Sequence, residues 1–160
     1  MKQYFITGTD TEVGKTYVTC QLLEAASKLG HKAIGYKPIS AGCELINGEW
    51  VNEDAASIQK SNSIDLPISE INPIALTPPI APHIAAVEAG VLLSDEKIIK
   101  GLGSLQTYKP DLLLMEGAGG WRLPLNVGDE TKPSRFLSDV VASIGMDVIL
   151  VVGMRLGCLN

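Results

Sequence analysis

Residues 8–16 carry the pattern in this chain best suited to chemistry, a glycine-rich loop that ends in a lysine and a threonine. The segment reads GTDTEVGKT, with Gly8 and Gly14 one residue further apart than in the commonest phosphate-binding loops. Between a strand and a helix, such a loop turns backbone N–H groups toward phosphate oxygens. Lys15 can then reach the β- and γ-phosphates of a nucleotide, and the Thr16 hydroxyl can bind Mg²⁺. A simple glycine-rich turn with an exposed lysine is the weaker interpretation.

Two acidic residues and a second lysine could complete this site. Glu116 ends an apolar run, where folds of this kind place a metal-binding acid beside the threonine of the loop. Asp54 lies near the start of a short predicted helix, where a carboxylate is often only a favourable charge at the helix end. Lys37 ends a predicted strand and is uninformative by itself. The residue types favour a phosphate and magnesium site without naming its substrate.

Alternating strands and helices are predicted to position these residues. Short apolar runs predict strands at 4–7, 32–36, 112–115 and 148–152, the last two buried on both faces. Helical spacing predicts helices from the loop to residue 30 and over 53–60, 94–105 and 136–144. The first helix carries its apolar residues at Val18, Leu22, Leu23, Ala26 and Leu29, and the proline-rich stretch 67–82 is expected to be irregular. The order predicts an α/β fold of the P-loop NTPase type, a doubly wound and mainly parallel sheet with ligands at the strands' carboxyl ends.

Composition and charge limit the classes of protein. Hydrophobic residues make up 46% of the 160 residues and charged residues 19%, as in soluble globular proteins. The net charge of −5 offers no long-range attraction to nucleic acid or to an anionic membrane. No apolar run approaches the roughly 20 residues of a membrane span. The three cysteines form no CxxC pair, which is typical of reduced thiols in a cytoplasmic protein.

The chain is expected to form one P-loop ATP-binding domain over residues 1–160. Its last predicted strand and the following loop reach Asn160, where a doubly wound fold would begin its next helix. We therefore expect a chain truncated at its C-terminus.

Several segments together resemble dethiobiotin synthetases. They are GTDTEVGKT at 8–16, GYKP at 35–38, Asp54, Pro82-His83, EGAGGW at 116–121 and GCLN at 157–160. The resemblance covers the whole chain and implies a homodimeric P-loop ligase of biotin biosynthesis that uses ATP and Mg²⁺. Its implied substrates are 7,8-diaminopelargonic acid and CO2 or bicarbonate, which it closes into the cyclic urea dethiobiotin with release of ADP and phosphate. It implies neither a nucleic acid nor a membrane partner.

The resemblance also implies roles for individual residues. Lys15 and Lys37 would be catalytic. Mg²⁺ would be held by Thr16, Asp54 and Glu116. The nucleotide would contact Thr11, Glu12, Val13, Gly14, Lys15, Thr16, Glu116 and Gly119. The substrate would contact Thr11, Glu12, Lys37, Ser40, Gly157, Cys158 and Asn160, the last three across a dimer interface. Many family members have a hydroxyl residue where this chain has Ala41, so either Ser40 replaces it or one hydrogen bond is missing.

Two other functions compete with this interpretation. An amide synthase of the cobyrinic-acid type has a related ATP domain, but it also needs a glutaminase domain, which residues 1–160 do not contain and which a truncated chain would carry downstream. A partition ATPase of the ParA or MinD type would carry a lysine four residues before the glycine of the GKT triplet. Asp10 stands at that position, which argues against such a switch.

Overall fold

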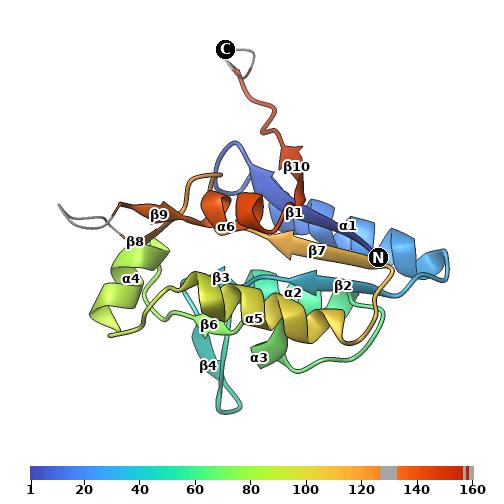
Figure 1. Cartoon of the computed structure of the whole chain (residues 1–160), viewed down its shortest axis with the longest axis horizontal. Helices are drawn as coiled ribbons and strands as arrows, with labels where there is room; N and C mark the ends of the chain where they lie inside the picture. The colour runs from blue at the N-terminus through green and yellow to red at the C-terminus, as the bar shows by residue number, and fades with distance from the viewer. Residues whose placement is uncertain (127–132, 157, 159–160) are drawn as a thin grey trace.

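A sheet of parallel strands forms the centre of the computed structural model, which describes residues 1–126, 133–156 and 158 (Figure 1). Its strands lie in the order β10-β1-β7-β2. Their bounds are Lys2–Gly8 for β1, Ala33–Tyr36 for β2, Leu112–Glu116 for β7 and Asp147–Val151 for β10. All three pairings are parallel, and Ile6 of β1 lies opposite Glu116 of β7. The carboxyl ends of the strands therefore meet at one edge, as the sequence predicted.

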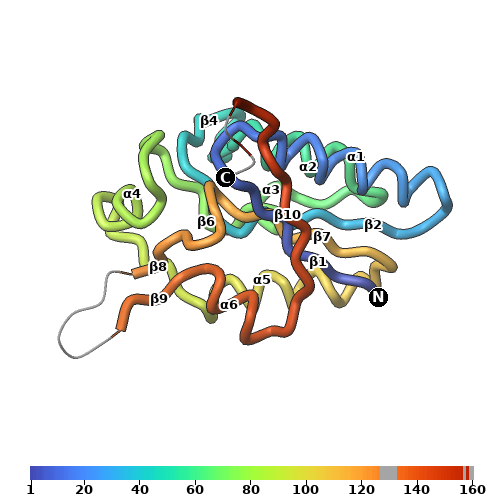
Figure 2. Tube along the Cα trace, turned by 90° about the horizontal axis from the view of Figure 1, so that it is seen from above, coloured from blue at the N-terminus to red at the C-terminus, as the bar shows by residue number. Residues whose placement is uncertain are grey.

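Helices cover both faces of the sheet. They are α1 (Lys15–Lys28), α2 (Glu53–Ser61), α5 (Asp95–Gln106) and α6 (Leu137–Ser143). Figure 2 shows α1 and α2 on one side of the sheet and α5 and α6 on the other. Side-chain caps start two of them: the Asn52 carbonyl oxygen accepts from the Ala55 N–H, and the Ser94 hydroxyl accepts from the Lys97 N–H. This arrangement confirms the predicted α/β fold.

Shorter elements connect the main ones. They are α3 (Ile68–Ile71), α4 (Pro82–Glu88) and three strand pairs, β3 (Ile39–Ser40) with β6 (Ile74–Ala75), β4 (Glu44–Ile46) with β5 (Glu49–Val51), and β8 (Pro124–Asn126) with β9 (Arg135–Phe136). The β4–β5 hairpin turns at Asn47 and Gly48, both with positive φ, as an Asn-Gly turn requires. No helix of the described residues is both long enough and apolar enough to cross a membrane.

The prediction that residues 67–82 are irregular was wrong in part. Helix α3 and strand β6 lie inside this stretch, and α4 begins at Pro82. Pro67 stands just before α3 and Pro82 is the first residue of α4, where a missing N–H costs no helical hydrogen bond. Proline marks the starts of these helices, although the number of prolines in the stretch favoured irregular chain.

The prediction that β10 is buried on both faces was also wrong. Val148 and Leu150 are 45% and 55% exposed. Strand β10 stands at the end of the sheet and pairs only with β1 among the described residues. An apolar run shows that a strand can be buried, but burial also requires neighbours on each side.

Helix α1 was predicted correctly, but of its five predicted apolar positions only Leu23 is fully buried. Leu29 is 77% exposed, whereas the buried residues of α1 are Lys15, Thr19 and Leu23. These three lie four residues apart and so form one stripe along the helix. The stripe is polar near the carboxyl end of the sheet because Lys15 and Thr19 find polar partners there, which the periodicity of apolar residues cannot reveal.

Two glycines of α5 provide a test of the packing between this helix and the sheet. A Cβ atom at Gly101 would overlap the hydroxyl of Tyr36, which is fully buried and donates to the Ile98 carbonyl over 2.9 Å. A Cβ at Gly103, two residues further, would meet no atom within 4 Å.

We therefore expect opposite effects from the same substitution. Gly101→Ala should lower the free energy of unfolding by about 1–3 kcal/mol because it overpacks the contact with Tyr36. Gly103→Ala should raise it by about 0.5–1 kcal/mol because alanine loses less backbone entropy in a helix. Urea unfolding followed by circular dichroism measures both, and equal stabilities of the two variants would contradict this packing.

Candidate functional site

The glycine-rich loop connects the end of β1 to the first residue of α1. Gly14 precedes the helix with a φ of 97°, and Glu12 also has a positive φ, of 57°. The Lys15 ammonium folds back over the loop and donates to the Asp10 carbonyl over 2.8 Å. Burial, and then the nearby charge of Lys37, lower the pKa of Lys15. The loop thus holds a lysine whose charge lacks a carboxylate partner within ion-pair distance among the described residues.

Val13 and Thr11 take different places in this loop. The Val13 side chain lies against the backbone of Gly8 and Gly153, where it would collide with any added Cβ. Val13 does not line the larger pocket, so only its backbone remains available for the predicted nucleotide contact. Thr11 lines that pocket, as do Glu12 and Gly14.

Glu116 is the most enclosed polar group of the site, with an exposed fraction of 0%. Its Oε1 accepts from the Thr16 hydroxyl over 2.8 Å and from the Lys37 ammonium over 2.7 Å. Its Oε2 accepts from the Thr19 hydroxyl over 2.6 Å. A carboxylate without water requires such donors, because an unpaired buried charge costs several kcal/mol or more. The structure therefore brings Glu116 and Thr16, which lie 100 residues apart, into direct contact.

Lys37 lies just beyond β2 and joins two carboxylates. Its Nζ is 2.7 Å from Glu116 Oε1 and 3.2 Å from Asp54 Oδ2. Burial by itself would lower the pKa of Lys37, but the charges of Glu116 and Asp54 outweigh it and hold that pKa above its ordinary value. The ammonium is charged at neutral pH, and the stabilisation that it gives is lost only as the pH rises through this elevated pKa.

Residues 71 and 72 hold the backbone at Lys37. The Lys37 N–H donates to the Ile71 carbonyl over 2.9 Å, and the Asn72 side-chain amide donates to the Lys37 carbonyl over 2.6 Å. The side-chain oxygen Oδ1 of Asn72 accepts from the Ser40 hydroxyl over 2.6 Å. Asn72 was not among the predicted residues. It lies within the stretch 67–82 that was predicted to be irregular, and no sequence motif marks it.

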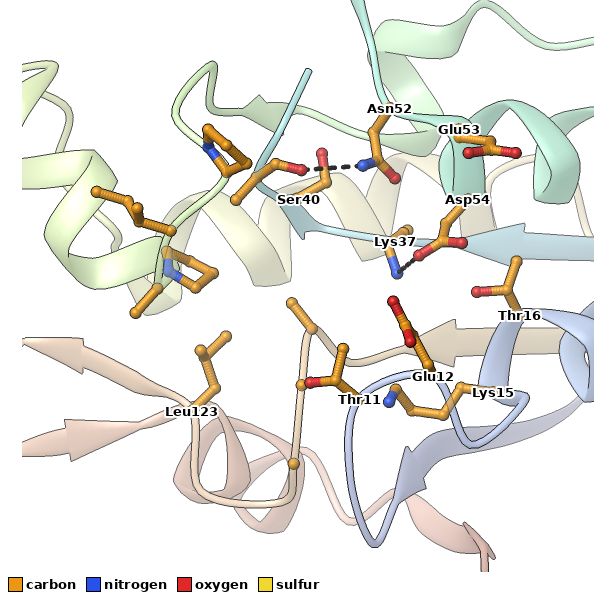
Figure 3. A pocket seen from close by; sticks show the side chains of 18 of the residues that line it. Thr11, Glu12, Lys15, Thr16, Lys37, Ser40, Asn52, Glu53, Asp54 and Leu123 are labelled. Atoms are coloured by element: carbon orange, nitrogen blue, oxygen red, sulfur yellow. Dashed lines mark hydrogen bonds and ion pairs between the residues drawn. The ribbon is translucent and has the colours of Figure 1, made fainter. Parts of the chain in front are cut away.

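A pocket of about 1070 Å³ opens in front of these groups (Figure 3). In Figure 3, the side chains of Glu12, Lys15 and Lys37 converge on its floor. It is lined by residues 11, 12, 14–17, 37, 40, 41, 52–54, 79–82, 118–120 and 122–124. Gly119 is among them, so every described residue predicted to contact nucleotide or substrate lines this pocket except Val13, the buried Glu116 and Cys158. Besides these polar groups, the lining of the pocket includes the apolar side chains of Ile80 and Leu123.

Ser40 reaches the pocket wall with its hydroxyl already engaged. Besides donating to Asn72, its Oγ lies 3.2 Å from Cys43 Sγ. The neighbouring Ala41 carbonyl accepts from the Asn52 amide over 3.0 Å, a contact drawn in Figure 3. A ligand could therefore use Ser40 as an acceptor without displacing a bond, but not as a donor.

Cys158 lies away from the larger pocket. It lines a second pocket of about 280 Å³ together with Asp10 and Arg155, which form an ion pair of 3.2 Å. Gly157 and Asn160 lie outside the described residues. Contacts of Gly157, Cys158 and Asn160 with substrate remain a prediction.

The predicted metal ligands have the chemistry that Mg²⁺ prefers. Thr16, Asp54 and Glu116 offer one hydroxyl and two carboxylates, all hard oxygen donors. Thr16 and Glu116 touch directly, and Asp54 is linked to Glu116 through the Lys37 ammonium. Within the described residues, no three His, Cys, Asp or Glu side chains gather in a way that could hold a metal. A site here therefore depends on the threonine and, as in other phosphate-binding loops, on oxygens of the nucleotide.

Comparisons with known proteins agree with this geometry. A family model described as "AAA domain" matches residues 2–160. The chain is 71% identical to "ATP-dependent dethiobiotin synthetase BioD" of Alteromonas mediterranea, over 100% of this chain and 70% of that protein. It is 45% identical to the protein of the same name from Aromatoleum aromaticum, over 99% of this chain and 68% of the relative.

A more distant relative gives the same result. "ATP-dependent dethiobiotin synthetase BioD 1" of Salmonella typhi is 42% identical, over 99% of this chain and 67% of that protein. With similarity of this extent along its whole length, the chain belongs to the dethiobiotin synthetase family of P-loop proteins.

Proposed function

We propose that this chain forms the catalytic site of an ATP-dependent ligase that converts 7,8-diaminopelargonic acid and CO2 or bicarbonate into dethiobiotin. Family membership supports the ATP-dependent ligase activity in biotin biosynthesis. The observation that carries the proposal is the position of Lys37, a buried cation at the floor of the pocket and next to the phosphate-binding loop. A reaction that joins an amine to CO2 and then phosphorylates the product passes through anions that need such a cation.

The proposed reaction has three steps. One amine of the substrate attacks CO2 and loses a proton, which gives a carbamate. A carbamate oxygen attacks the γ-phosphate of ATP, so that the bond to the β-phosphate oxygen breaks and ADP leaves. The second amine attacks the carbamoyl carbon, loses a proton to the medium, closes the urea ring and expels phosphate.

We assign the chain's residues to binding and charge neutralisation, since phosphoryl transfer requires little covalent help from the protein. Lys15 turns from the Asp10 carbonyl to the β- and γ-phosphates, and backbone N–H groups of residues 12–16 bind the same phosphates. Lys37 stabilises the carbamate and the charge that develops as it is phosphorylated. Glu12 and Thr11 face the amines, for which a carboxylate and a hydroxyl are suitable acceptors. Mg²⁺, held by Thr16, Asp54 and Glu116, would neutralise phosphate charge.

The proposal includes features that concern the assembled protein. We infer a cytoplasmic homodimer whose catalytic domain spans residues 1–160. Gly157, Cys158 and Asn160 of one subunit would contact the substrate bound to the other. The resemblance of the GCLN segment to the family supports this assignment, and the separation of Cys158 from the larger pocket of its own chain is compatible with it.

Coupling between ATP cleavage and both other substrates tests the reaction. Phosphate release should be slow with ATP alone or with ATP and diamine in CO2-depleted buffer, and fast with diamine and bicarbonate together. The reason is that only the carbamate places an oxygen in line with the γ-phosphate. Lys15→Ala should abolish release under every condition while leaving the melting temperature nearly unchanged. Rapid release with ATP alone, indifferent to diamine, would instead support a partition-type ATPase.

The Lys37→Gln substitution tests whether Lys37 acts on the carbamate or on the nucleotide. The diamine-dependent rate should fall about 100-fold or more, because a preorganised charge on the reacting group is lost. Affinity for ATP, measured by binding in the absence of diamine, should change little. Lys60→Gln, at an exposed position of α2, is the matched control. A variant that loses ATP affinity while keeping its diamine-dependent kcat would assign Lys37 to the nucleotide.

Asp54→Asn tests the metal assignment. We expect the Mg²⁺ concentration for half-maximal rate to rise about tenfold or more, as a carboxylate ligand is replaced by a neutral amide. Asp65→Asn makes the same chemical change at an exposed position outside the pocket and should have no effect. If Asp54→Asn raises only the KM of the diamine, Asp54 belongs to the substrate instead.

A further inference from the structure

We propose that Thr19 is a positioning residue of the phosphoryl-transfer site, whose hydroxyl fixes the rotation of the Glu116 carboxylate. The inference rests on the proposed function, in which Glu116 and Thr16 hold Mg²⁺. Thr19 itself neither lines the larger pocket nor reaches a reacting atom. It would act on the reaction only through Glu116.

The two oxygens of Glu116 have unequal partners. Oε1 accepts from Thr16 and from Lys37, the two groups that face the pocket. Among the described residues, Oε2 accepts only from the Thr19 hydroxyl, at 2.6 Å. The last torsion of a glutamate side chain has weak intrinsic preferences, so its neighbours decide how the carboxylate is turned. The bond to Thr19 holds Oε2 on the side away from Thr16 and Lys37 and thereby keeps Oε1 beside these two donors.

Thr19 has one hydroxyl proton and two possible acceptors. Its Oγ1 lies 2.9 Å from the Lys15 carbonyl, the usual partner four residues earlier in a helix, and 2.6 Å from Glu116 Oε2. We assign the Thr19 hydroxyl proton to the hydrogen bond with Glu116, because a hydrogen bond to an ionised oxygen is shorter and stronger than one to a neutral carbonyl. Thr19 would have a satisfactory partner without Glu116, whereas Oε2 has no other donor among the described residues.

Thr7 shows that the fold does not require every buried threonine to form such a bond. Thr7 is 2% exposed, and its hydroxyl has no hydrogen-bond partner among the described residues. A core threonine is therefore tolerated on packing alone in this protein. The buried carboxylate, in contrast, requires the hydrogen bond from Thr19. An unpaired buried charge costs more free energy than an unpaired buried hydroxyl.

The spacing of residues along helix α1 directs Thr19 toward Glu116. Thr16 and Thr19 lie three residues apart and so project from the same side of the helix, toward the end of β7. One helix thus supplies a donor to each oxygen of Glu116. A rotation of the carboxylate would break both contacts and move Oε1 from its position beside Thr16.

Isosteric substitution in the full-length enzyme tests the proposal. Thr19→Val keeps the shape and removes the hydroxyl, and Thr19→Ser keeps the hydroxyl. Thr7→Val removes a buried hydroxyl that has no partner among the described residues and is the matched control. The Mg²⁺ concentration for half-maximal rate should rise about tenfold in Thr19→Val, the lower end of the usual loss when a group that orients a metal ligand is removed. Thr19→Ser and Thr7→Val should match the wild type.

A second readout does not depend on turnover. The rise in melting temperature that Mg²⁺ causes in the presence of ADP should shrink in Thr19→Val and persist in the other two variants, while ADP affinity without Mg²⁺ stays the same. This measurement remains valid even if diamine fails to stimulate phosphate release, an outcome that would refute the proposed function alone.

Three results would overturn the role of Thr19. They are wild-type Mg²⁺ dependence of Thr19→Val in both readouts, equal losses in Thr19→Val and Thr7→Val, and failure of Thr19→Ser to restore Mg²⁺ dependence. If Thr19→Val does not fold, Thr19→Cys replaces it, since a thiol is only a weak donor. The cysteine variant should show a smaller loss in the same direction, and full wild-type Mg²⁺ dependence in it would refute the proposal.

Discussion

The burial of the Glu116 carboxylate is the constraint on which the rest of the site depends. A charge removed from water must be given hydrogen bonds and opposite charge, or the fold loses several kcal/mol. Glu116 obtains them from two hydroxyls of α1 and from the ammonium beyond β2. These elements are therefore held at fixed distances from the end of β7. The same contacts that give the buried carboxylate its hydrogen bonds also assemble the floor of the pocket.

Lys37 connects this constraint to the proposed chemistry. The Lys37 ammonium lies within 3.2 Å of both Asp54 and Glu116, and so offsets part of the negative charge of the two carboxylates. A magnesium ion with the same ligands would take over part of that task, which would leave the ammonium freer to interact with an anion in the pocket. The metal, the nucleotide and the carbamate would thus interact with the same charged side chains, those of Lys37, Asp54 and Glu116. Asn72, which holds the Lys37 carbonyl, and Ser40, which is bound to Asn72, keep the lysine backbone in place for this exchange.

Much of the fold followed from the sequence because its signals are local. The β1 strand, the glycine-rich loop and α1 were predicted together from the order of apolar residues, glycines and the GKT triplet, and the structure confirms them. The errors arose where the outcome depends on distant partners. Strand β10 has the composition of a buried strand, but its exposure is decided by what lies beside it. The prolines at 67 and 82 suggested irregular chain, although proline is equally suited to the first turn of a helix.

From the sequence alone follow a phosphate-binding loop, a further lysine and two carboxylates at strand and helix ends, and the motifs of a dethiobiotin synthetase. These are properties of short segments, and the physical reasons for them, backbone amides at a helix start and oxygen donors for a hard cation, act over a few residues. Tertiary contacts alone bring Thr16, Thr19 and Lys37 to Glu116. They also join Asp54 to Lys37 and engage the Ser40 hydroxyl with Asn72. Thr19 was missed because a threonine in a helix interior has no distinctive pattern. Its role follows from facing a buried carboxylate 97 residues away, and that pairing exists only once the chain has folded.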